Sequence, residues 1–216
     1  MDDVESRRRA DAETFVANLE DELRCTAPGR PLSVLDVIEG SDSSNLVHCM
    51  VRLDGYPLRI DIMSGWWMSV GADGVANAVL QAHGYACEKA GIAKLLLRRH
   101  GRDWSTRSGS RQEPGDPTQS GDHTDMDAVT DILQRLEKTA SRVSTAMRRF
   151  ERRHHPEHRE ITGPHGLFTL TLRGSFIDGA RVDMIRLGPE DASALASDAL
   201  AALTAARSGT SRNGGS

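Results

Sequence analysis

Apolar residues recur every three or four positions between residues 126 and 153, and neither proline nor glycine interrupts this stretch. Such spacing is typical of a helix that lays a narrow apolar seam against another helix. At ~1.5 Å per residue the helix would be roughly 40 Å long. An ordinary core helix has the same spacing, but a rod of this length favours a partner helix. The seam consists of Met126, Val129, Leu133, Leu136, Ala140, Val143, Met147 and Phe150.

The N-terminal half begins with a second amphipathic pattern. Residues 4–24 place apolar side chains on one side and acidic side chains elsewhere, which predicts a helix. Residues 34–38 include the β-branched Val34, Val37 and Ile38 and are expected to be extended. Residues 46–53 alternate apolar and polar side chains, the pattern of a half-buried strand. Residues 75–99 return to helical spacing, with small apolar residues along one face.

A hairpin is predicted inside this half. Asp54 and Gly55 form a turn dipeptide between two strand-like runs. Pro57 cannot donate a backbone hydrogen bond, so the returning strand, residues 58–63, is expected at an edge of the sheet. The side chains of that strand expected to face the core are Leu58, Ile60 and Ile62.

The C-terminal half has a similar pattern after a segment rich in Gly, Ser, Pro and charge, residues 101–124, which is expected to be a flexible linker. The long helix of residues 126–153 comes next. The following elements are then predicted: an extended run at 159–162, a strand at 167–173, a turn at 174–179, a returning strand at 180–187 with Val182 and Met184 inward, a helix at 192–206 and a disordered tail at 208–216.

The two halves therefore share one order of elements, which predicts an α+β fold with an internal repeat. Each repeat has a long helix, a three-stranded antiparallel sheet and a C-terminal helix. The units are expected at residues 1–100 and 125–207. A unit that cannot cover its own long helix is expected to pair with its copy, which predicts an intramolecular pseudo-dimer.

The order of elements and the strand pair LFTLTLRG and ARVDMIRL resemble the YbaB/EbfC nucleoid-associated family. Most of the likeness lies in residues 125–207, and the first half repeats it more weakly. Members of that family are small homodimers that bind DNA with little sequence preference. The resemblance implies a tandem version in which one monomeric chain makes the pseudo-dimer. Two departures are the duplication within one chain and the net acidic charge of the first half.

Composition is that of a globular protein, with 38% hydrophobic and 27% charged residues and a net charge of −4. No apolar run approaches the ~18 residues of a membrane span, and the start MDDVESRRRA lacks the apolar core of a secretory signal. Cys25, Cys49 and Cys87 share no metal-ligand or redox spacing, which indicates a reducing compartment. A cytoplasmic location without membrane contact is therefore expected, and the resemblance implies association with the nucleoid.

Motifs for catalysis are absent from the sequence: there is no phosphate-binding glycine loop, HExxH, Cys-x-x-Cys or nucleophile elbow. His154 and His158 are one helical turn apart, but Pro156 lies between them and argues against a metal site. Asp61 and Asp183 occupy matching positions beside arginines and are expected in cross-strand ion pairs. The sequence predicts neither an enzyme nor a cofactor or metal.

Arginine is concentrated towards the end of the long helix. Dipole stabilisation needs only one or two cations there, so the surplus fits either a phosphate contact or a solvated face. The family resemblance favours contact with the phosphates of double-stranded DNA. A second basic group near the N-terminus opposes its helix dipole and allows either a phosphate contact or a solvated face. The candidate nucleic-acid-binding residues are Arg142, Arg148, Arg149, Arg152, Arg153, Arg7, Arg8 and Arg9.

An alternative function uses the same scaffold without DNA. Trp66 and Trp67 follow the first hairpin and could anchor a protein partner or cap the open end of a small core. Together with the acidic first half and the apolar seam, they allow a protein-interaction or chaperone-like adaptor, for example a secretion-associated one. Both functions remain open at the level of sequence.

Overall fold

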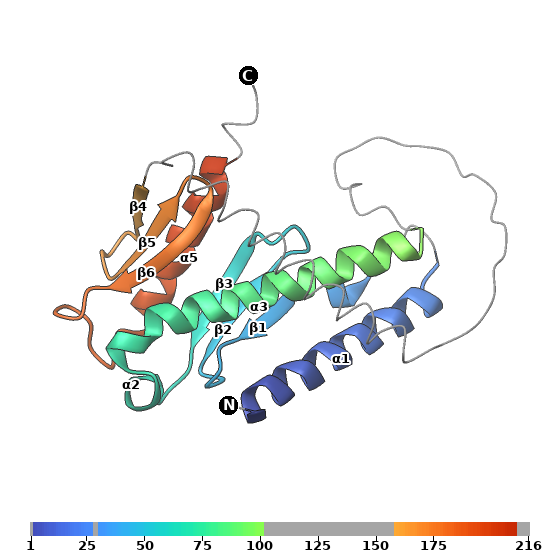
Figure 1. Ribbon diagram of the computed structural model, residues 1–216, viewed down its shortest axis with the longest axis horizontal. Helices are drawn as coiled ribbons and strands as arrows, with labels where there is room; N and C mark the ends of the chain where they lie inside the picture. Colours follow the sequence, from blue (N-terminus) through green and yellow to red (C-terminus); the bar gives the residue numbers. More distant parts are fainter. Residues whose placement is uncertain (1, 28–29, 102–157, 211–216) are drawn as a thin grey trace, which may run out of the picture. The chain divides into compact units, whose positions relative to one another are not determined.

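The computed structural model describes residues 2–27, 30–101 and 158–210 (Figure 1). The predicted linker and the predicted long helix, with its apolar seam, fall within residues 102–157 and lie outside the described residues. The predicted pairing of two long helices therefore involves one helix that is not described.

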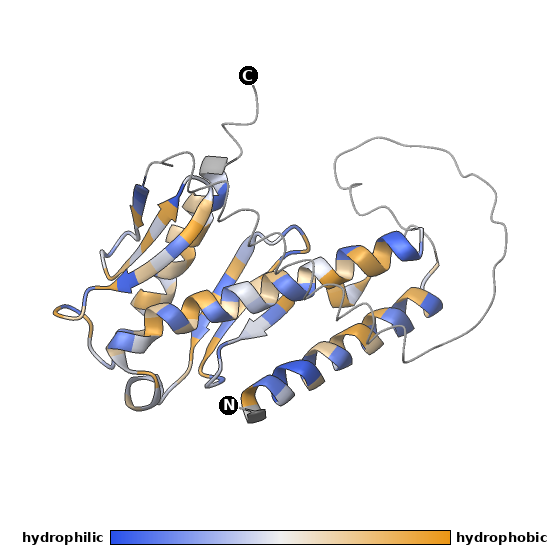
Figure 2. Cartoon of the chain, viewed as in Figure 1, coloured by the Kyte–Doolittle hydropathy of each residue, from blue (hydrophilic) through white to orange (hydrophobic). Residues whose placement is uncertain are grey.

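Helix α1 (Asp2–Cys25) confirms the prediction for residues 4–24. Along α1, hydrophilic residues alternate with apolar ones (Figure 2), and its buried side chains include Phe15, Val16, Leu19 and Leu23. This apolar face packs against helix α3 (Gly71–Arg99). The described partner of the first long helix is thus the C-terminal helix of the same half.

The expectation of an extended segment at residues 34–38 was wrong for its first residues. Ser33–Leu35 form a short 3-10 helix, η1, and strand β1 (Ile38–Ser41) begins only afterwards. The carboxylate of Glu22 on α1 accepts hydrogen bonds from the backbone amides of Ser33 (2.5 Å) and Val34 (2.9 Å). This tertiary cap favours a helical turn and outweighs the strand preference of the β-branched residues.

The first sheet has the order β1-β2-β3, with β2 at Val47–Val51 and β3 at Pro57–Ile62. Pro57 lies on the edge strand as predicted, and Gly55 has the positive φ of +80° that its turn requires. The prediction that Leu58 faces the core was wrong, because the register shifts between Met50 and Val51. This bulge turns Pro57 inward and leaves Leu58 39% exposed.

Helix α2 (Trp66–Ser69) and α3 follow the first sheet, and α3 begins four residues before the predicted position. The predicted stripe on α3 is buried, and α3 contacts β1 and β2. A Cβ added at Gly40 would overlap the backbone of Ala82 and Ala86. The strand and the helix therefore approach one another closely because residue 40 has no side chain.

The second sheet has the order β4-β5-β6, with β4 at His158–Thr162, β5 at Phe168–Arg173 and β6 at Phe176–Val182. The first two strands confirm their predictions. The expected turn at 174–179 was too long, because Gly174, with φ +62°, makes a tight turn and Phe176 already pairs with Arg173. Met184 was expected to point inward and is 55% exposed, since β6 ends at Val182.

Helix α5 (Ala192–Thr210) closes the described chain. It extends beyond the predicted end at residue 206, so residues 208–210, which were expected in a disordered tail, are helical. Helix α5 contacts β5 and β4 of its own half and also β3 of the first half, while α3 contacts β6 of the second half (Figure 1). The α+β class with two three-stranded antiparallel sheets is therefore observed.

Candidate functional site

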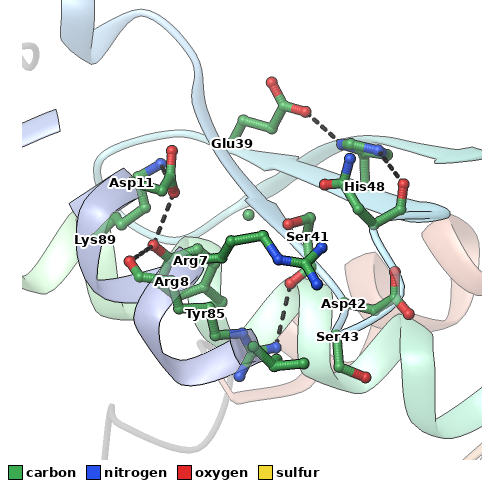
Figure 3. A pocket seen from close by; sticks show the side chains of 13 residues that line it. Arg7, Arg8, Asp11, Glu39, Ser41, Asp42, Ser43, His48, Tyr85 and Lys89 are labelled. Carbon is green, nitrogen blue, oxygen red and sulfur yellow. Dashed lines mark hydrogen bonds and ion pairs between the residues drawn. The ribbon is translucent and has the colours of Figure 1, made fainter. Parts of the chain in front are cut away.

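A cleft of about 370 Å³ lies where α1, the edge strand β1, the turn after β1 and α3 meet (Figure 3). Cationic, acidic and hydroxyl-bearing side chains line it together, and two of the predicted arginines are among them. The residues that line the cleft are Val4, Arg7, Arg8, Asp11, Glu39, Gly40, Ser41, Asp42, Ser43, Asn45, His48, Tyr85 and Lys89.

The floor of the cleft joins α1 to α3 through Lys89. The Lys89 side chain is only 7% exposed, and its ammonium lies 2.9 Å from the carboxylate of Asp11. The same ammonium lies 5.1 Å from the ring centre of Phe15 and 5.4 Å from that of Tyr85. An ion pair and two cation–π contacts thus offset the cost of burying this charge.

Tyr85 adds a hydrogen bond to the same joint. Its hydroxyl oxygen lies 2.7 Å from both Asp11 Oδ2 and the backbone carbonyl oxygen of Arg8, and it donates to one of them. Burial, together with the adjacent Asp11 carboxylate, raises the pKa of Tyr85. The hydroxyl therefore keeps its proton at neutral pH and acts as a donor here.

Arg8 spans the cleft from α1 to the edge of β1. Its Nη2 donates to the backbone carbonyl oxygen of Ser41 at 3.2 Å, and its guanidinium lies 5.2 Å from the ring centre of Tyr85. The Nε atom of Arg8 is buried and has no hydrogen-bond acceptor within the described part of the chain. A buried donor without an acceptor is unfavourable, so this atom marks a position where an acceptor from a ligand would be stabilised.

The acidic side chains of the cleft are already engaged. Glu39 lies 2.6 Å from His48 Nδ1. Asp42 holds its own turn by accepting from the backbone amides of Ser44, Leu46 and Val47 at 2.9 to 3.0 Å. Burial opposes the ionisation of Asp42, but these hydrogen bonds together lower its pKa below the usual value. The carboxylates are therefore already engaged with neighbouring side chains and backbone amides.

Only part of the predicted nucleic-acid-binding set is described. Arg7 is exposed and lines the cleft, and Arg8 is partly buried in it. Arg9 points elsewhere and pairs with Glu13 at 3.0 Å, one turn further along α1. The cluster of Arg142, Arg148, Arg149, Arg152 and Arg153 lies outside the described residues. The structure thus brings Arg7 and Arg8 together and separates Arg9 from them.

The two tryptophans differ in exposure. Trp66 is 1% exposed, and its ring meets the half-buried ring of Trp67 edge to face at 5.2 Å between centroids. A buried side chain cannot contact a partner unless the fold opens, so the assignment of Trp66 to partner binding is corrected to a core position. Trp67 keeps some accessible surface.

The expectation that Asp61 and Asp183 form cross-strand ion pairs was wrong within the described residues. Arg59 pairs with Asp61 at 2.8 Å along the same strand, β3. Arg181 on β6 instead reaches across β5 to Glu160 on β4, at 2.5 and 2.9 Å. The carboxylate of Asp183 accepts from the backbone amide of Ile185. These side chains form ordinary surface contacts.

Asp11, Tyr85 and Lys89 were missed because Asp11 lies more than 70 residues from the other two in sequence and meets them only through helix packing. One signal was present: Lys89 interrupts a helix face that otherwise contains buried small residues such as Ala86, Ala90 and Ala93. A charged residue at such a position indicates a buried counter-ion.

No protein-family model, no curated protein and no solved structure matches the chain. Among the described residues, no group of three or more His, Cys, Asp or Glu side chains is arranged to hold a metal ion. A helix long and apolar enough to cross a membrane is also absent from this part of the chain.

Proposed function

We propose that this chain is a DNA-binding protein of the nucleoid-associated type, which contacts the phosphate backbone with little sequence preference. In this proposal two copies of one α+β unit are fused and pair within the chain as a pseudo-dimer. The observation that carries it is the reciprocal contact between halves: α3 contacts β6, and α5 contacts β3. Each C-terminal helix thereby contacts the third strand of the other sheet.

A second relationship supports the repeat. Gly40 in the first half packs against the backbone of α3, and Gly163, just after β4, packs against α5. A Cβ at Gly163 would lie 2.5 Å from Cγ of Asp198. In both halves, a glycine at the end of the first strand allows the C-terminal helix to approach the sheet. Shared packing of this kind is expected of two copies of one unit.

The DNA contacts of this proposal reside in the arginine-rich segment of residues 142–153. Over the described ranges acidic residues outnumber basic ones, and several exposed arginines already face carboxylates. Examples are the pairs Arg9–Glu13 and Arg52–Asp54. A surface of this charge repels phosphates, so binding must depend on a segment in which arginine is in excess. Arg7 could contribute one further phosphate contact.

Fluorescence anisotropy of a labelled duplex, measured with the full chain at two salt concentrations, tests the proposal. Binding through several phosphates should weaken by roughly 10³-fold or more between about 50 and 200 mM salt. The double substitution Arg148→Glu and Arg152→Glu should abolish binding. Arg52→Glu with Arg59→Glu is the matched control, because it changes the charge equally at two exposed positions on the first sheet.

An unchanged affinity in the Arg148→Glu, Arg152→Glu protein would contradict the assigned contacts, and the absence of binding at low salt would contradict DNA binding as such.

The pseudo-dimer has its own test. Light scattering should give the mass of one chain, 23.5 kDa, whereas a stable dimer would count against internal pairing.

A protein-interaction adaptor is the second candidate, favoured by exposed apolar side chains that follow the last strand of each sheet. Met63 (48%) and Met68 (88%) follow β3, and Met184 (55%) and Ile185 (97%) follow β6. Methionine-rich surfaces adapt to protein partners. Under this function, Met68→Ser with Ile185→Ser would abolish partner binding, whereas under the first proposal it would leave the affinity for DNA unchanged.

A further inference from the structure

The geometry of the cleft points to a binding site for an extended, acidic peptide segment that pairs with the edge of β1. This inference is independent of DNA binding, since the residues that carry it are not those of the arginine-rich segment 142–153. It rests on three properties of the cleft as the described residues form it: a strand edge with no paired strand, a buried guanidinium nitrogen without an acceptor, and carboxylates that are already engaged.

Strand β1 is an edge strand, and its register determines which backbone groups face outward. Asp42 N donates to the carbonyl oxygen of Val47, and Gly40 is opposite Cys49, two residues along. In an antiparallel pair, hydrogen-bonded and non-hydrogen-bonded residues alternate. The N–H and C=O groups of Gly40 therefore point to β2, whereas those of Glu39 and Ser41 point away from the sheet.

Glu39 and Ser41 both line the cleft, on the side that faces α1. Arg8 already donates to the carbonyl oxygen of Ser41, as a neighbouring strand would. An extended segment in the cleft could pair with the remaining outward groups, the N–H and C=O of Glu39 and the N–H of Ser41. Strand addition at an open edge is a common mode of peptide recognition.

The charges of the cleft favour an acidic segment. Arg8 Nε is buried without an acceptor within the described residues, and the exposed Arg7 also lines the cleft (Figure 3). The opposing carboxylates of Asp11 and Glu39 are paired with Lys89 and His48. A carboxylate or carbonyl of the peptide would therefore be the acceptor that Arg8 lacks.

Size and rigidity also suit a short peptide. The volume of about 370 Å³ is at the lower end of ligand sites, which run from roughly 300 to 1,000 Å³. The close contact of Gly40 with Ala82 and Ala86 holds β1 against α3, so the strand edge is fixed before a ligand arrives. A preformed edge of this kind lowers the ordering cost of binding.

A nucleic-acid backbone is a poorer occupant of this cleft. Phosphate oxygens lack donors for the outward carbonyl oxygen of Glu39. A peptide supplies both donors and acceptors at the spacing of a strand.

Amide hydrogen exchange in the full, unliganded chain is the first test. The amides of Glu39 and Ser41 should exchange about tenfold or more faster than that of Gly40, because only the Gly40 amide is bonded to β2. Protection of all three amides would overturn the proposal, since it would mean that another part of the chain already covers this edge.

The second test titrates the protein with a blocked pentapeptide of alternating Glu and Val, followed by NMR of the same amides. The peptide should shift the amide resonances of Glu39 and Ser41 and protect these amides from exchange. The same peptide with Lys for Glu, or N-methylated at alternate positions, should have an affinity at least about tenfold lower. No change at millimolar peptide would overturn the proposal, as would equal shifts with a DNA duplex.

Arg8→Met and Arg9→Met form a matched pair of variants, because the residues are neighbours on α1 and only Arg8 lines the cleft. Methionine keeps the apolar part of the side chain against Tyr85. Arg8→Met should weaken peptide binding about tenfold or more, and Arg9→Met should leave it unchanged. Equal affinity in both variants would contradict the role of Arg8, and the exchange measurement on the unsubstituted chain tests the edge independently.

Discussion

The carboxylate of Asp198 on α5 accepts a hydrogen bond from the backbone amide of Leu167 at 2.6 Å. The Asp198 side chain is completely buried, and it also accepts from the amide and the ring Nδ1 of His165. One carboxylate thus holds the turn between β4 and β5 against the C-terminal helix. Asp42 holds the corresponding turn between β1 and β2 from within the turn itself.

Asp198→Asn should destabilise the fold by about 2–4 kcal/mol, because the amide nitrogen would face backbone donors and leave them without an acceptor. Urea unfolding at pH 7 measures the difference. Asp178→Asn, which alters an exposed pair with Arg173, is the control and should change stability by less than about 1 kcal/mol. Equal effects of the two substitutions would contradict the structural role of Asp198.

Stability should also depend on pH through Asp198. Burial opposes its ionisation, but the hydrogen bonds from His165, Leu167 and Phe168 together lower its pKa below the usual 3.8. A carboxyl whose pKa is lower in the folded state stabilises the fold above the unfolded pKa and loses that effect as pH falls through the folded pKa. Unfolding free energies measured from pH 6 to 2 should therefore fall more steeply for the natural sequence than for Asp198→Asn.

Gly40→Ala should destabilise the protein by about 1–3 kcal/mol, since the new Cβ would overlap the backbone of α3. Gly84→Ala is the matched control: it lies within α3, and an added Cβ there meets no atom within 4 Å. That change should stabilise by about 0.5–1 kcal/mol, the difference between the two residues in a helix. Thermal unfolding of both variants checks the opposite signs.

Asp11→Asn should cost about 1–3 kcal/mol, because it leaves the ammonium of Lys89 buried without its counter-ion. The lower part of this range reflects the exposure of Asp11, whose side chain is 53% accessible. Glu13, two residues after Asp11 on the same helix, forms an exposed pair with Arg9. Glu13→Gln should therefore cost less than about 0.5 kcal/mol. A similarly small loss in both variants would contradict the role of Asp11, since it would show that the fold tolerates an unpaired Lys89 on α3.

Alkylation should distinguish the three free cysteines. Cys25 is exposed, whereas Cys49 is buried, and burial raises the pKa of its thiol to about 12. Because the thiolate is the reactive form, iodoacetamide at pH 8 should modify Cys25 rapidly and Cys49 only after unfolding. Mass spectrometry of peptides checks the order, and prompt labelling of Cys49 in the folded chain would contradict its core position.

Much of the fold was predictable because its apolar pattern is local. Alternation along residues 168–172 and the small apolar stripe of α3 each predicted an element that the structure contains. Prediction failed where a distant group intervened. Glu22 stabilises a helical turn at Ser33, and a bulge opposite Met50 turns Leu58 outward. Neither effect is visible in the spacing of the residues concerned.

The cleft illustrates the same limit. Arginine at positions 7 and 8 identified a basic group in the sequence, but not that Arg8 would stack on Tyr85 and bind the edge of β1. Those contacts join residues more than 30 and more than 70 positions apart. The separation of Arg9 from its neighbours also follows from packing, since only one side of α1 faces the cleft.

The sequence by itself determined the type and order of most of the described elements and the α+β class, because hydrophobic periodicity lies in consecutive residues. The tertiary structure alone decided which helix packs against which strand. Within the described residues it also placed a buried lysine, an edge strand and a guanidinium nitrogen without an acceptor around one cleft. Such contacts depend on the distances between elements, and no local pattern encodes them.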